Sequence, residues 1–247
     1  MLTILLATLF LPLFPFSTAL NAALAQVRHP VARFAVLLVW PQIGVLLIHQ
    51  VQESIPQWLA AWALLSATFY ALRLLTCRDL GRYAGYLASS SLALTWALAA
   101  SGAETETLAL FALWLSLPAA LMLLLADVMS RRFGAAYAGL CPGLGNTFPR
   151  LSALLVATTL AAIATPPFPG FFALLGLFTQ LHGLSLVVVL TIWLLWGWAA
   201  TRLLQSFIAG ECRYEGIADL TQRSTVIWSG LLIALTGAGL ALNGGIL

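Results

Sequence analysis

The chain has 247 residues, of which 62% are hydrophobic and only 8% are charged. A soluble domain carries roughly a quarter charged residues, so this composition excludes an ordinary soluble fold and predicts an integral membrane protein. The net charge of +3 comes from eleven basic residues, all of them arginine. These arginines are scattered along the chain, so they do not form the basic face that nucleic-acid binding requires.

Apolar runs of about 20 residues, the length that crosses a bilayer, recur along the whole chain. The first run lacks a basic start and is predicted to be a retained helix, not a cleaved signal peptide. The eight expected spans are Met1–Ala25, Val31–His49, Gln57–Leu75, Tyr83–Ala100, Thr107–Val128, Leu151–Leu181, Leu184–Thr201 and Thr225–Leu247. The predicted fold is an all-α, polytopic membrane helix bundle. Residues 1–56 are expected to form a two-helix segment and residues 57–247 a six-helix bundle.

The distribution of charge predicts the orientation. With the amino terminus outside, every arginine falls in an inner segment, and the outer loops carry Glu53, Glu104 and Glu106 instead. Because basic loops face the cytoplasm, we expect both termini outside. The inner arginines are Arg28, Arg33, Arg73, Arg78, Arg82, Arg131, Arg132, Arg150, Arg202, Arg213 and Arg223. The cysteines, Cys77, Cys141 and Cys212, also fall inside, where a reducing compartment keeps thiols free.

The sixth span is too long for one straight crossing. Residues 151–181 would form a helix of about 46 Å, against a hydrocarbon core of about 30 Å. The span is interrupted by Thr165, Pro166, Pro167, Pro169 and Gly170. Either two short helices form a re-entrant hairpin, or one helix crosses and is broken at Thr165–Phe172. The broken helix keeps all the arginines on one side, and we expect it.

Proline has no amide hydrogen, so the break should leave carbonyl groups near Ala162, Ile163 and Thr165 without helical partners. The nearest hydroxyls that could satisfy them belong to Thr158, Thr159 and Thr165 itself. Broken helices recur at ion and substrate sites in transporters. A kink that serves only packing is the alternative, and the sequence leaves both open.

Several segments resemble one family. Asp79 to Tyr86, followed by Ser89, Ser90 and Ser91, resembles a motif of the antiporter-like subunits. These are the proton-pumping membrane subunits of respiratory complex I, shared with multisubunit cation/proton antiporters and membrane-bound hydrogenases. The Pro-rich break resembles the discontinuous twelfth helix of that family, and residues 202–210 and 219–223 resemble the segment before its last core helix. The positions that match its motifs are Asp79, Arg82, Tyr86, Asp219 and Arg223.

The resemblance covers residues 57–247, and the departures limit what it implies. Family members have about fourteen helices, and this chain resembles their second half. It lacks the block with the glutamate and lysines of the first half-channel. Gly81 replaces the motif lysine, Ser91 stands where the family has a histidine, and a second family histidine falls near Leu115. The charged residue after the break falls at Ala173 or Leu174. The resemblance therefore implies a subunit that does not pump by itself.

No span carries an ionisable residue near its centre, where such residues mark function. Asp127 lies one turn from Arg131, with which an i, i+4 pair is expected, and it is the first charge to test. His49 and His182 lie at outer ends. The candidates for a proton or polar path are Asp127, His49, His182, Ser89, Ser90, Ser91, Thr158 and Thr159, with Thr95 and Ser116 as further hydroxyls. The face of Gly230, Ala234, Gly237 and Ala241 in the last span is expected to pack closely on another helix.

The sequence predicts no catalytic site, cofactor or metal site, because it contains no metal-spaced cluster, phosphate loop or nucleophile–base pair. We expect an accessory membrane subunit of a proton- or cation-coupled complex in the inner (cytoplasmic) membrane. That complex would be complex I-like, antiporter-like or an energy-coupled inorganic-carbon uptake system. Its partners would be other membrane subunits, the lipid bilayer and a peripheral cytoplasmic subunit. The alternatives are a self-contained transporter or channel for a small neutral solute, and an assembly scaffold without conduction.

Overall fold

The computed structural model describes residues 2–51, 55–139, 142–211 and 218–243. Glu53, Cys141, Cys212 and Arg213 lie outside these ranges. The described residues form helices and no strands, so the predicted all-α membrane bundle is confirmed. The helices are α1 (Leu2–Phe10), α2 (Ser17–Gln26), α3 (Pro30–His49), α4 (Gln57–Leu74), α5 (Leu80–Ala100), α6 (Thr105–Phe133), α7 (Leu144–Thr147), α8 (Pro149–Ala162), α9 (Pro169–Gln180), α10 (Leu184–Ile208) and α11 (Gln222–Asn243).

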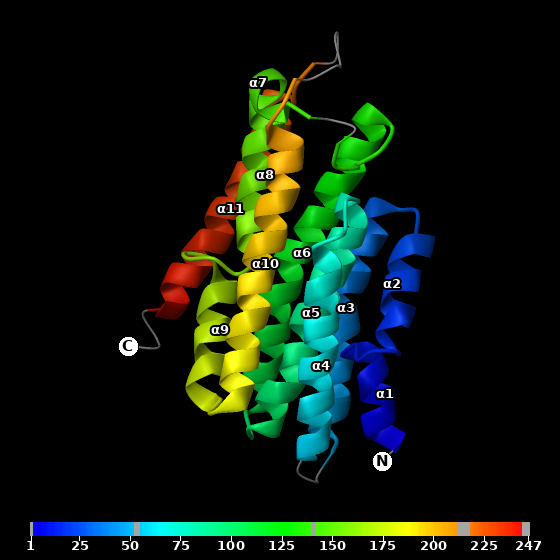
Figure 1. Cartoon of the computed structure of the whole chain (residues 1–247), viewed down its shortest axis with the longest axis vertical. Helices are drawn as coiled ribbons and strands as arrows, with labels where there is room; N and C mark the ends of the chain where they lie inside the picture. The colour runs from blue at the N-terminus through cyan, green and yellow to red at the C-terminus, as the bar shows by residue number, and fades with distance from the viewer. Residues whose placement is uncertain (1, 52–54, 140–141, 212–217, 244–247) are drawn as a thin grey trace.

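The long helices run roughly side by side, and their connections lie at two opposite ends (Figure 1). The connections α2–α3, α4–α5, α6–α7 and α10–α11 share one end, at the top of the view. The connections α3–α4, α5–α6 and α9–α10 share the other. The described arginines belong to the first set of connections or to the helix turns beside them, and we call this end the arginine end. The arrangement agrees with the predicted separation of charge, while which end faces the cytoplasm stays a prediction.

The core of the bundle is α5. Every residue from Leu87 to Ala99 on this helix is buried, including Trp96. Alanines and serines recur along it, and these small side chains let α4 and α6 approach closely. Four described helices are long and apolar enough to cross a membrane, namely α3, α6, α10 and residues Gln222–Ala241 of α11, and α8 and α9 are shorter apolar helices. The count of eight crossings therefore stays a prediction.

The first span differs from the expectation of one continuous helix. Residues 11–16 separate α1 from α2, so the bundle contains a second broken span besides the predicted one. Pro12 and Pro15 lie in this interval. Neither can donate an amide hydrogen to a helical turn, which is the physical reason for the break.

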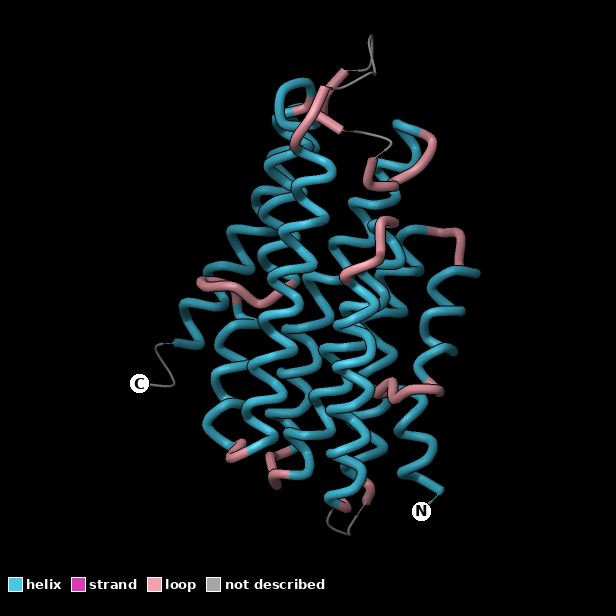
Figure 2. Tube along the Cα trace, viewed as in Figure 1, coloured by secondary structure: helices cyan, strands magenta, loops and turns pink. Residues whose placement is uncertain are grey.

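The sixth span is a broken crossing and not a hairpin. Helix α8 descends from the arginine end, the chain turns near mid-height, and α9 continues to the opposite end (Figure 2). Helix α11 lies along α8 and α9 (Figure 1). Its buried face consists of Trp228, Leu232, Leu235 and Gly239. The small-residue face of Gly230, Ala234, Gly237 and Ala241 is exposed, so no described helix covers it and its close packing stays a prediction.

Candidate functional site

Side chains around the α8–α9 break satisfy its backbone groups. The indole nitrogen of Trp193, on α10, donates a hydrogen bond to the Ile163 carbonyl at 3.0 Å. The hydroxyl and the amide of Thr165 both donate to the Leu160 carbonyl, at 2.9 and 3.2 Å. The Phe168 amide donates to the Thr165 carbonyl at 3.1 Å. An unpaired carbonyl costs several kcal/mol in lipid, so these bonds are what make the break stable.

The break has an exposed side and a buried side. Pro166 and Pro167 are exposed, whereas Pro169 and Gly170 are buried. The chain turns at Ala164, whose φ of 55° lies in the left-handed region. That conformation costs an L residue roughly 1–2 kcal/mol, so the surrounding packing must hold it. Strained residues of this kind gather at functional elements, and a functional role of the break stays a prediction.

Helix α11 packs directly on the break through Gly239. A methyl group at this position would overlap the Pro167 carbonyl oxygen and would lie 2.8 Å from the Pro169 nitrogen. Gly237, two residues earlier, has no atom within 4 Å of the corresponding point. The close approach of α11 to the break therefore depends on glycine at 239 and not at 237.

Carbonyl groups at the α1–α2 break also accept hydrogen bonds from side chains of other helices. Indole nitrogens from three other helices donate to its carbonyl groups, and the amide of Phe14 donates to the Ser66 hydroxyl at 3.1 Å. Gly44 of α3 lies against Leu11, whose Cγ is 2.7 Å from the position of a Cβ at residue 44. The three indole bonds join Trp40 to Leu9 at 3.0 Å, Trp96 to Leu11 at 2.9 Å and Trp62 to Phe14 at 2.8 Å. Both breaks thus use tryptophan donors and a glycine from a neighbouring helix.

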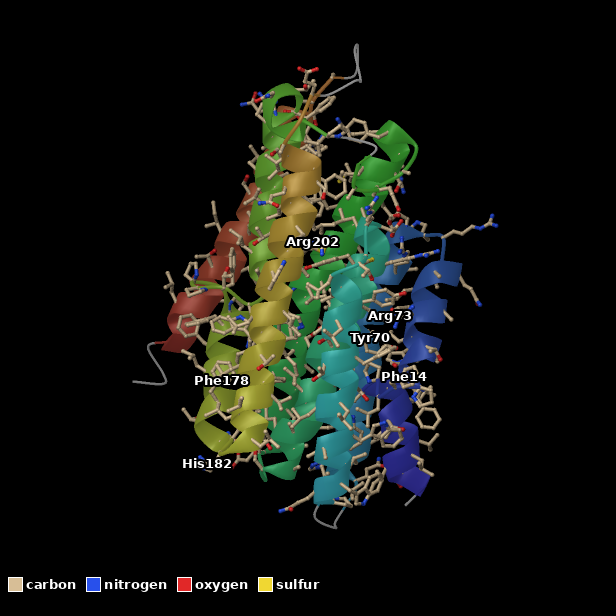
Figure 3. All side chains as sticks on the ribbon, viewed as in Figure 1. Phe14, Tyr70, Arg73, Phe178, His182 and Arg202 are labelled. Atoms are coloured by element: carbon tan, nitrogen blue, oxygen red, sulfur yellow. The ribbon has the colours of Figure 1, made fainter. Side chains whose placement is uncertain are left out.

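The serines of the motif join helices. They donate to backbone carbonyls of Gly85, Ala67 and Ala88, and two of them also accept a bond from another helix. Polar bonds join Asn21 to Ser89 at 2.9 Å, Trp196 to Ser90 at 2.9 Å and Ser17 to Tyr70 at 2.6 Å. Figure 3 labels Tyr70 on α4, beside the α1–α2 side of the bundle. These bonds tie α2, α4 and α10 to one another and to α5.

Three threonines contrast with the serines. Thr95, Thr158 and Thr159 are fully buried, and their hydroxyls have no hydrogen-bond partner among the described residues. Of the three threonines expected to satisfy the break, only Thr165 donates a hydrogen bond there, and its acceptor is the Leu160 carbonyl instead of Ala162, Ile163 or Thr165. Ser116 donates to the carbonyl of Leu113, in its own helix. The place of Thr158 and Thr159 in a polar path stays a prediction.

Asp127 forms an ion pair with Arg33. Its Oδ1 lies 3.1 Å from Nη1 of Arg33, on α3, and the two side chains are 20% and 17% exposed. The expected partner, Arg131, is not within ion-pair distance. Oδ2 of Asp127 and Nε of Arg33 are buried without a partner in the described part of the chain. The pair connects α3 to α6 near the arginine end, away from the middle of the bundle.

The basic motif segment begins α5. Oδ1 of Asp79 accepts a hydrogen bond from the Arg82 amide at 2.7 Å and so caps the helix. Nη2 of Arg33 lies 3.5 Å from the point where residue 81 would carry a Cβ. A guanidinium from another helix therefore lies beside Gly81, the position of the missing motif lysine. The Tyr86 ring packs against the guanidinium of Arg73, with 5.0 Å between the ring centroid and Cζ.

Asp219 caps a different helix. Its carboxylate accepts hydrogen bonds from the amides of Arg150 and Leu151, at 2.9 and 3.3 Å, at the start of α8. The Arg150 guanidinium donates to the Leu220 carbonyl at 3.0 Å. Arg223 is exposed on the first turn of α11. The segment before α11 therefore fixes the α8 amino terminus, a structural role.

The two candidate histidines lie at the end opposite the arginines. Nδ1 of His49 lies 2.9 Å from the Thr105 hydroxyl at an exposed position. His182 is exposed between α9 and α10 (Figure 3). Neither is near Asp127, so the structure does not bring the predicted ionisable candidates together. Throughout the described helices, Asp, Glu, Arg and His stay within about two turns of a helix end.

Sequence reasoning missed the α1–α2 break, although Pro12 and Pro15 carry the signal that identified the α8–α9 break. It also missed the tryptophan donors and Gly239, because no local pattern shows which helix faces a freed carbonyl.

No family model matches the sequence, and no curated protein matches it. Solved structures match the fold. A chain of respiratory complex I from Thermus thermophilus with bound NADH has a TM-score of 0.78 and 22% identity, covering 96% of this chain and 53% of that one. A chain of the membrane-bound sulfane sulfur reductase, an archaeal respiratory membrane complex, has a TM-score of 0.79 and 17% identity, covering 96% of this chain and 52% of that one. A chain of the Mrp complex from Dietzia sp. DQ12-45-1b has a TM-score of 0.83 and 14% identity, covering 97% of this chain and 55% of that one.

The chain thus spans about half the length of the chains it matches. The predicted resemblance is confirmed as a likeness of fold, and it extends over nearly the whole chain instead of residues 57–247 alone.

Proposed function

We propose that this chain is a membrane subunit of a multisubunit proton- or cation-coupled complex in the inner (cytoplasmic) membrane, and that it does not pump by itself. The observation that carries the proposal is the fold, which is shared over 96–97% of this chain with about half of a chain in each of three complexes. Other membrane subunits are its partners, and the arginine end is the place for a peripheral cytoplasmic one.

The absence of a charge relay supports a structural role. A proton path needs titratable groups or ordered water in the membrane interior. Among the described residues, the one ion pair is Arg33–Asp127, and it lies near the arginine end. The Ile163 carbonyl at one break, and the Leu9, Leu11 and Phe14 carbonyls at the other, accept hydrogen bonds from indole nitrogens. These bonds brace the bundle and leave those four carbonyl groups unavailable to a passing ion.

The exposed small-residue face of α11 fits this role. Gly230, Ala234, Gly237 and Ala241 follow a spacing that places them on one side of the helix, and the chain itself leaves them uncovered. Small residues let two helix backbones approach closely in a membrane. Within the proposed complex, this face would receive a helix of a neighbouring membrane subunit.

Purification tests the proposal. The tagged full-length chain, expressed from its own locus and extracted in a mild detergent, should elute as a large particle with other membrane proteins in fixed ratios. An unrelated polytopic protein with the same tag serves as the control. Elution of the chain alone, with the mass of a single copy in its micelle, would contradict the proposal.

A second candidate function is a self-contained transporter or channel for a small neutral solute, which needs no buried charge. One observation favours it. A cavity of about 330 Å³ lies between α6 and α9, beside Phe111 and Phe172. The indole nitrogen of Trp114, another lining residue, is buried without a partner in the described part of the chain. Solute flux into liposomes that contain the chain alone would select this function.

A further inference from the structure

A polar cavity of about 440 Å³ lies at the arginine end, between the α4–α5 turn and α10. Arg78 and Arg202 line it, together with the buried side chains of Leu74 and Leu203. Figure 3 labels Arg202 in the upper half of α10, below the end of that helix. The cavity therefore combines two guanidinium groups with an apolar wall at the edge of the bundle.

The charge of this cavity is not balanced by its own residues. None of its lining residues is acidic. The nearest carboxylate along the chain, Asp79, caps α5. Within the described ranges, neither Arg78 nor Arg202 has a carboxylate within 4.0 Å or a side-chain hydrogen bond. The hydroxyls of Thr76 and Ser206 already donate to backbone carbonyls.

The guanidiniums are therefore the strong free donors of the cavity. Two such groups favour a planar or tetrahedral oxyanion, and arginine binds phosphate in particular through paired N–H groups. The lining thus indicates a phosphate group as the ligand.

The surface below the cavity indicates what carries that phosphate. Trp198 and Leu194 precede Arg202 at four-residue intervals, which places the three side chains on one face of α10. Trp198 is 66% exposed and Leu194 is 71% exposed. Tryptophan favours the headgroup level of a membrane, and an exposed leucine one turn further in fits an acyl chain. This order along α10 is that of a phospholipid, with the headgroup first and the hydrocarbon below.

We propose that the phosphate of an anionic phospholipid binds between Arg78 and Arg202, with an acyl chain along Trp198 and Leu194. Basic pockets between membrane helices on the cytoplasmic side bind such headgroups. The site belongs to the edge of the bundle and does not depend on the function proposed above.

Native mass spectrometry of the full-length, delipidated chain tests the site with dioleoylphosphatidylglycerol as the probe. Dioleoylphosphatidylcholine and inorganic phosphate are the two comparison ligands. The wild type should retain dioleoylphosphatidylglycerol in preference to dioleoylphosphatidylcholine. In the variant R78Q/R202Q, affinity should fall about twentyfold, because each basic group near the headgroup contributes roughly fivefold.

The matched control is R28Q/R131Q, which removes the same charge from two exposed arginines at the same end that do not line the cavity. It should bind within about twofold of the wild type, since neither side chain lines the cavity and salt screens exposed charges. R78K/R202K, which keeps the charge but not the paired N–H groups, should recover part of the lost binding. Equal losses in the two Gln variants, or no loss in R78Q/R202Q, would overturn the site. Displacement of the lipid by millimolar inorganic phosphate would overturn the lipid as its ligand.

Discussion

Gly239 of α11 lies against the carbonyl group of Pro167 in the α8–α9 break, and a methyl group at 239 would overlap that oxygen. The contact joins the last helix of the chain to its most irregular segment. Because the Pro169 nitrogen is also only 2.8 Å from the position of such a methyl group, relief in one direction creates a clash in another. Helix α11 can therefore keep its place only while residue 239 has no side chain.

The substitution G239A should destabilise the bundle. Forcing a methyl group into a packed backbone contact costs about 1–3 kcal/mol, and α11 must shift outward to avoid it. Thermal unfolding of the purified chain in detergent measures the loss, with G237A as the control because the space at that glycine is open. Equal melting temperatures for the two variants would show that α11 does not rest on the break.

Replacing the tryptophan donor at the break should also weaken the structure. In W193F the Ile163 carbonyl, now bonded at 3.0 Å, loses its partner inside the membrane. The cost should be about 1–2 kcal/mol, measured as the free energy of unfolding in a dodecyl sulfate titration. W198F, at an exposed position on the same helix, should unfold like the wild type. A loss of the same size in W198F would show that stability falls because the indole ring is replaced by a smaller one, and not because a hydrogen bond is lost.

The prolines at the exposed side of the break should matter for assembly. Alanine has an amide hydrogen and is favoured over proline in a helix by about 3 kcal/mol. In P166A/P167A, α8 is therefore expected to extend toward α9 and to alter the surface that α11 and its neighbours cover. Less partner protein should co-purify with the variant, and the activity of the complex should fall. Unchanged assembly together with unchanged activity would show that the break serves only packing within the chain.

The thiol of Cys77, in the α4–α5 turn, should react slowly. Burial raises the pKa of this thiol from 9.0 to about 11. Since only the thiolate reacts, alkylation at pH 8 should be slow and should rise about tenfold per pH unit until the pKa is reached.

Iodoacetamide labelling in a C141S/C212S background measures this rate. In the same background, T76C/C77S moves the thiol to the neighbouring exposed position and should react faster at pH 8. A Cys77 rate that levels off near pH 9 would mean that the thiol is not buried.

Local signals in the sequence predicted much of the fold. The apolar runs marked most helices to within a few residues, and the position of the arginines distinguished a broken sixth span from a hairpin. The first break was overlooked because Pro12 and Pro15 lie in a run that is apolar throughout, and hydropathy alone does not register a missing amide hydrogen.

The site itself was less predictable, because its contacts join distant residues. Local helix geometry suggested Arg131 as the partner of Asp127, yet the ion pair is with Arg33, 94 residues away. Trp193 is 30 residues from the carbonyl it satisfies. Gly239 could be distinguished from Gly237 only when the rotation of α11 about its axis was known. Periodicity restricts such a rotation weakly in a helix that is apolar on every side.

A chain that supports a coupled complex and carries no proton relay of its own should not conduct protons alone. The most direct test is proton flux into liposomes that contain only the full-length chain, measured with an internal pH dye under an imposed potassium diffusion potential. We expect a rate equal to that of protein-free liposomes, with gramicidin as the positive control. A robust flux that requires the chain, and that D127N abolishes, would contradict it.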